Sequence, residues 1–81
     1  ISVFPNPTTN SSTINYFSAS NSEVNISLMN IVGEKITTVY SGTVSTGNNQ
    51  FEINMEELPK GIYIVRVSGD HGIRSVKLIK E

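Results

Sequence analysis

The feature that most constrains the fold is the segment of residues 58–67, which reads Leu-Pro-Lys-Gly-Ile-Tyr-Ile-Val-Arg-Val. Pro59 fixes its own φ angle and Gly61 can adopt a positive φ angle, so a sharp bend is favoured here. The β-branched residues that follow favour a strand. In Greek-key sandwiches, a tyrosine just past such a corner donates a hydrogen bond to the preceding connection. We therefore expect a tyrosine corner at Tyr63; the alternative is an ordinary half-buried strand tyrosine.

The rest of the chain shows short apolar segments separated by turn signals. The clearest alternation covers residues 23–29, where Val24, Ile26 and Leu28 are apolar and the residues between them are polar. Further strands are expected over residues 1–4, 13–17, 35–40, 50–55, 61–68 and 73–80, and residues 41–49 are expected to form a loop that includes at most a short edge strand. Together with the corner, this spacing predicts an all-β, immunoglobulin-like Greek-key β-sandwich of about seven strands.

Length and composition indicate one small domain without covalent or metal support. The chain has 81 residues and no cysteine, so disulfides and thiolate metal sites are excluded. The net charge of −1 produces no field that would attract nucleic acid. Most of the basic residues nevertheless lie in residues 58–80, which indicates a solvated face or, alternatively, a partner site. Because the chain begins at Ile1, we expect residues 1–81 to be one domain of a longer protein.

The side chains that carry chemistry are few and scattered. The one histidine, His71, lies in an Asp-His-Gly segment expected to be a hairpin loop, where a solvated turn residue is the simplest interpretation. Glu52, Glu56 and Glu57 form the one acidic cluster, and they lack the interleaved Asp, Asn and Gly pattern of calcium loops. The sequence therefore predicts no catalytic residue, no metal, no cofactor and no small-molecule substrate.

Four short motifs occur in a fixed order along the whole chain: Pro5-Asn6-Pro7, Gly33 before Lys35, Leu58 with Gly61 and Tyr63, and Lys77-Leu78-Ile79-Lys80-Glu81. This ordered set resembles the C-terminal sorting domain of the type IX secretion system (Por secretion system) of Bacteroidetes. The resemblance implies an immunoglobulin-like domain at the C-terminus of a larger secreted protein. It also implies export of the N-terminal passenger through the periplasm and the outer membrane to the medium or the cell surface.

The resemblance further implies partners and site residues. The partners are the outer-membrane secretion machinery and a sortase-like peptidase that cleaves upstream of Ile1, after which the passenger can be joined to surface lipopolysaccharide. Residues 77–81 match the terminal strand that the machinery reads, although Glu81 is acidic where many members end in lysine or a small residue. We expect Lys77 and Lys80 to present charge beside Leu78 and Ile79, readable by strand addition or by a groove. Alternatively, the lysines only protect a sheet edge from aggregation.

Two other classes of function remain open on the residues alone. A passive immunoglobulin-like or fibronectin-like spacer of a cell-surface protein would have the same strand pattern. A carbohydrate-binding module is less favoured, because the chain has no tryptophan and only three tyrosines and three phenylalanines to stack on sugars. An enzyme is the least favoured class.

Overall fold

The computed structural model describes residues 1–70 and 72–81, so the interpretation of His71 lies outside the described residues. The described residues form seven strands and no helix, and therefore no helix that could cross a membrane. The strands are β1 (Ser2–Phe4), β2 (Ser11–Ser18), β3 (Ser22–Asn30), β4 (Lys35–Val44), β5 (Gly47–Asn54), β6 (Gly61–Gly69) and β7 (Gly72–Lys80).

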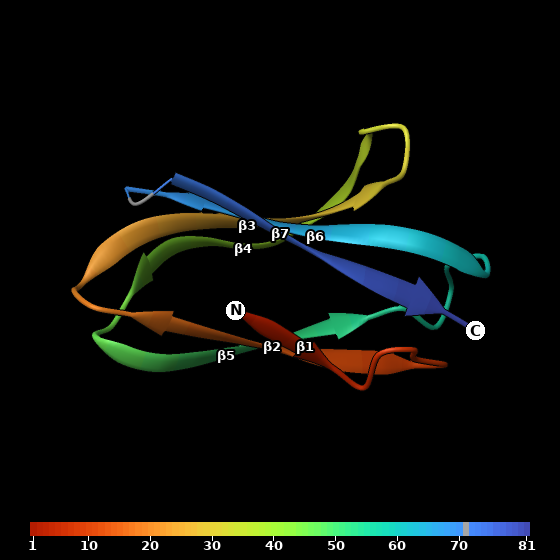
Figure 1. The fold of residues 1–81 in the computed structure, drawn as a ribbon, viewed down its shortest axis with the longest axis horizontal. Coiled ribbons are helices and arrows are strands. Elements are labelled where there is room, and N and C mark those ends of the chain that lie inside the picture. The colour runs from red at the N-terminus through yellow and green to blue at the C-terminus, as the bar shows by residue number, and fades with distance from the viewer. Residues whose placement is uncertain (71) are drawn as a thin grey trace.

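The strands form two antiparallel sheets that face each other as two layers (Figure 1). One sheet has the order β1-β2-β5 and the other has the order β4-β3-β6-β7. The chain changes sheet after β2, after β4 and again after β5, which is the crossing pattern of a Greek-key sandwich. The predicted all-β, immunoglobulin-like sandwich is therefore confirmed.

The core lies between the sheets and follows the predicted alternation. Val24, Ile26 and Leu28 of β3 are buried, and Asn25 between them is exposed. The buried apolar residues are Val3, Ile14, Val24, Ile26, Leu28, Val44, Ile53, Met55, Tyr63, Val65, Val67 and Leu78. Every strand contributes at least one of them, so the core holds both sheets together.

The predicted tyrosine corner is present. The Oη atom of Tyr63 donates a hydrogen bond of 2.6 Å to the backbone carbonyl oxygen of Pro59, and the tyrosine ring is buried. Tyr63 follows the connection from β5 to β6, where the chain passes from one sheet to the other. The corner thus fixes the start of β6, and β6 pairs with β7 along its whole length.

Two loops are shorter than the sequence predicts. Residues 41–44 continue β4 and pair with β3, so the expected loop over residues 41–49 is wrong and β5 already begins at Gly47. Irregularities in the β3–β4 register and a 2.6 Å hydrogen bond from Tyr40 Oη to the carbonyl oxygen of Thr43 accompany this extension. Pairing with a neighbouring strand here overrides the loop preference of Ser41 and Gly42. The hairpin after β6 is also tighter, because Gly69 pairs with Gly72.

Candidate functional site

The opening motif and the terminal strand, at opposite ends of the sequence, form one structural unit. The Nδ2 atom of Asn6 donates a hydrogen bond of 2.7 Å to the carbonyl oxygen of Lys77. The backbone N–H of Ile79 donates to the Oδ1 atom of Asn6 at 3.0 Å. One amide side chain therefore satisfies a backbone acceptor and a backbone donor on the same edge of β7.

Thr8 continues this contact along the strand. Its backbone N–H donates to the carbonyl oxygen of Ile79 at 2.8 Å, and the N–H of Glu81 donates to its carbonyl oxygen at 2.8 Å. Thr8 and Lys80 form a parallel bridge. We refer to Asn6 and Thr8, with their four hydrogen bonds to residues 77–81, as the edge clamp.

The clamp is itself held from the side of β2. The hydroxyl of Ser12 donates a hydrogen bond of 2.7 Å to the carbonyl oxygen of Pro5, and the hydroxyl of Thr8 donates to the carbonyl oxygen of Ser11 at 2.8 Å. Pro5 and Pro7 lack the N–H group that ladder pairing needs, so the segment meets β7 through the side chain of Asn6 instead. The sequence indicates a broken strand at these prolines, but it does not indicate which strand they contact.

The terminal residues alternate between the two sides of the sheet. Lys77 and Glu81 are exposed and Ile79 is half-buried on the outer side, whereas Leu78 and Lys80 are buried on the inner side. The expectation that both lysines are exposed is correct for Lys77 and wrong for Lys80, which is 8% exposed. The reason is geometric: successive strand residues point to opposite faces, so positions 77 and 80 cannot share one.

The ammonium group of Lys80 binds backbone carbonyls inside the fold. Its Nζ atom donates to the carbonyl oxygen of Met55 at 2.8 Å and to that of Glu56 at 3.4 Å. Both acceptors belong to the turn that leads from β5 into the tyrosine corner. Lys80 is buried, and its ammonium group links the last strand to this turn.

Strand addition at residues 77–81 conflicts with this arrangement. β7 is an edge strand of its sheet, but the edge clamp already occupies the outward backbone groups of Lys77, Ile79 and Glu81. A partner that meets the folded domain here contacts the side chains of these three residues. Leu78 and Lys80 are not accessible to it.

The clamp leads to a stability prediction. We expect Asn6→Ala to lower the free energy of unfolding by ~1–2 kcal/mol, because two hydrogen bonds to the backbone are lost. Urea unfolding measures the change, and amide hydrogen exchange should be faster at Ile79. Asn48→Ala is the matched control, because Asn48 is exposed and its side chain has no hydrogen bond to the described residues. Unchanged exchange at Ile79 in the Asn6→Ala variant would contradict the clamp.

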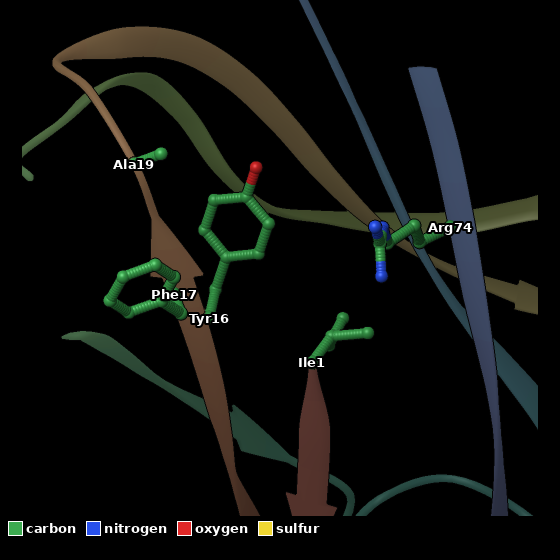
Figure 2. Close-up of a pocket in the computed structure, with 5 residues that line it drawn as sticks. All are labelled: Ile1, Tyr16, Phe17, Ala19 and Arg74. Atoms are coloured by element: carbon green, nitrogen blue, oxygen red, sulfur yellow. The ribbon is translucent and has the colours of Figure 1, made fainter. Parts of the chain in front are cut away.

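A pocket lies away from the edge clamp and is lined by Ile1, Tyr16, Phe17, Ala19 and Arg74. Figure 2 shows the Tyr16 ring and the Arg74 guanidinium group on opposite sides of this space. The described residues that line it include no carboxylate, histidine or cysteine, and their polar side-chain groups are the Tyr16 hydroxyl and the Arg74 guanidinium group. Elsewhere in residues 1–70 and 72–81, no three His, Cys, Asp or Glu side chains are grouped to hold a metal ion.

The fold and the clamped terminal strand define a small immunoglobulin-like sandwich. Residues 2–81 match the family of the secretion system C-terminal sorting domain, and the chain belongs to this family. The predicted membership in the type IX sorting domains is confirmed. No curated protein matches the chain.

Family membership gives the function at a coarse level. The domain is a type IX C-terminal sorting signal that acts with the secretion machinery on an N-terminal passenger. Its destination is the cell surface or the medium. Domains of this family are in general not enzymes.

Proposed function

We propose that the secretion machinery reads the outer side of the clamped terminal strand, at Lys77, Ile79 and Glu81, while the domain is folded. The observation that carries this proposal is the edge clamp, which holds the backbone of residues 77–81 in one conformation. A pre-ordered strand costs less entropy on binding than a flexible tail. Leu78 and Lys80 then act as anchors that hold the strand rather than as contacts for the partner.

The exposed residues specify the chemistry of the partner surface. Lys77 provides a cation next to the apolar Ile79 and opposite Ile64 on β6. A complementary surface has an apolar centre for Ile79, an anionic group for Lys77 and a cationic group for Glu81, because opposite potentials speed encounter and like charges exclude wrong partners. The passive-spacer alternative would assign no partner to this strand.

The later steps of the proposal concern the passenger. A sortase-like peptidase cleaves the connection upstream of Ile1, and the passenger is then attached to surface lipopolysaccharide. Cleavage there leaves the edge clamp intact, because the clamp uses Asn6, Thr8 and residues 77–81. The sorting domain is therefore released as a folded unit.

Export of a passenger fusion tests the recognition step. In a Bacteroidetes host, we expect Lys77→Glu to reduce secretion of the passenger about tenfold, which corresponds to ~1.4 kcal/mol. Folding should hardly change, because exposed substitutions usually alter stability by no more than ~0.5 kcal/mol. Arg74→Glu is the matched control, since it reverses the same charge on the same strand at the pocket of Figure 2.

The outcomes separate the alternatives. Normal secretion of the Lys77→Glu fusion would show that this ammonium group is not read. Retention of the wild-type fusion would mean that the domain does not act as a sorting signal in that host. Passenger that keeps the domain after it reaches the surface would contradict the peptidase step alone.

A further inference from the structure

A shallow groove crosses the outer face of the four-stranded sheet, on the side away from the core. The residues that line it come from β3, β6, β7 and the β3–β4 turn, and they include Met29, Ile31, Ile64, Arg66, Ile73 and Ser75. In Figure 1 the tip of the β3–β4 hairpin, drawn in yellow, rises above the sheet, and its residues Ile31 and Gly33 line the groove as a wall. Ile31 on this wall is 70% exposed and Ile73 is 59% exposed. Large apolar side chains gathered in one exposed depression are typical of a docking surface.

Arg66 supplies the charge in this groove. It alternates with the buried residues Val65 and Val67 on β6 and pairs with Ser75 on β7. Its guanidinium group has no ion pair and no hydrogen bond to the described residues, and no aspartate or glutamate lines the groove. A guanidinium fork matches a carboxylate with two parallel hydrogen bonds. A ligand that complements the groove therefore carries an anionic group between apolar groups.

The adjacent edge of β7 favours an extended occupant. The clamp uses outward backbone groups of the odd-numbered residues 77, 79 and 81, so those of Ile73 and Ser75 also point away from β6. No backbone hydrogen bond beyond the β6 ladder involves these two residues within the described part of the chain. An unpaired edge of this kind pairs with an extended segment.

We propose that this groove binds an extended peptide segment of a partner protein, with a carboxylate side chain for Arg66 and an apolar side chain on either side of it. The inference rests on the proposed function, because the partner is then a protein of the secretion machinery. The groove and the clamped terminal strand are continuous, since Ile64 in the groove pairs directly with Lys77. Arg66 in the groove and Lys77 beside it supply two positive charges that suit an acidic segment.

Defined peptides test the groove without the secretion machinery. The probes are Thr-Ile-Thr-Glu-Thr-Ile-Thr, which places Ile, Glu and Ile on one face of a strand, and the same peptide with Lys in place of Glu. In amide NMR titrations of the 81-residue chain, we expect the Glu peptide to bind at least ~tenfold more tightly than the Lys peptide. The shifted resonances should be those of Ile64, Arg66, Ile73 and Ser75.

Matched variants keep the test independent of folding and net charge. Arg66→Glu should reverse the preference between the two peptides, and Arg66→Met, which keeps the aliphatic stem, should abolish it. Arg74→Glu makes the same change in net charge at the pocket of Figure 2 and should leave the ratio within about twofold. Equal binding of the two peptides, no binding, or the same loss in Arg74→Glu would overturn the proposal.

Export of fusions distinguishes failure of the groove from failure of the sorting function. We expect Arg66→Glu to reduce passenger secretion about tenfold relative to Arg74→Glu. If the wild-type fusion is secreted and Arg66→Glu is secreted equally well, the groove is not a contact of the machinery, and the sorting function stands. If the wild-type fusion is retained while the peptide preference is observed, the machinery is the wrong partner, and the peptide site stands.

Discussion

Lys80→Glu is expected to destabilise the domain by at least ~3 kcal/mol, while Lys77→Glu leaves the urea midpoint nearly unchanged. The glutamate would place a carboxylate against the carbonyl oxygens of Met55 and Glu56, which now accept hydrogen bonds from the Lys80 ammonium group. A buried charge without a partner is among the costliest changes in a protein. For a domain whose total stability is of the order of 5–15 kcal/mol, such a loss leaves a substantial unfolded fraction.

Circular dichroism in urea measures this difference. Lys80→Met is the matched variant, because it keeps most of the aliphatic stem but removes the donor, and it should lie between wild type and Lys80→Glu. Equal midpoints for Lys80→Glu and Lys77→Glu would contradict the buried position of Lys80. The functional consequence is that a double substitution of both lysines cannot test recognition, since its passenger would be retained because the domain is unfolded.

Leu78→Ala is expected to cost ~2–5 kcal/mol, because the Leu78 side chain is fully buried in the core and its removal leaves a cavity. Ile79→Ala on the neighbouring position should cost less, since Ile79 is half-buried on the outer face. Denaturant unfolding of both variants measures the difference. A larger cost at Ile79 than at Leu78 would mean that the strand faces the other way.

Export of fusions should distinguish the folding role of Leu78 from the recognition role of Lys77. Secretion of the Leu78→Ala fusion should recover at a lower growth temperature, where more of the weakened domain is folded. Secretion of the Lys77→Glu fusion should not recover, because that variant is folded and lacks a contact. Recovery of both would assign residues 77–81 to folding alone.

The local sequence was sufficient to predict the class of fold and one of the hydrogen bonds that stabilise it. Alternation at Val24, Ile26 and Leu28 places one face of β3 in the core, because strand geometry has a period of two residues. The corner at Pro59 and Tyr63 also involves neighbours in the sequence, so its hydrogen bond was predictable. The same period shows that Lys77 and Lys80 lie on opposite faces, and burial of Leu78 assigns Lys80 to the inside.

Tertiary structure alone decided what the terminal strand contacts. Asn6 and Lys77 are 71 residues apart, and no local periodicity can report that they meet. Residues 41–44 form a strand for the same reason. Ser41 and Gly42 have little preference of their own for a strand, and pairing with β3 places them in one. The groove around Arg66 likewise exists only because β3, β6 and β7 lie side by side. The sequence by itself determined which side chains alternate and where the chain turns, whereas long-range pairing, which depends on the whole sandwich closing, decided which edges are covered and which remain open.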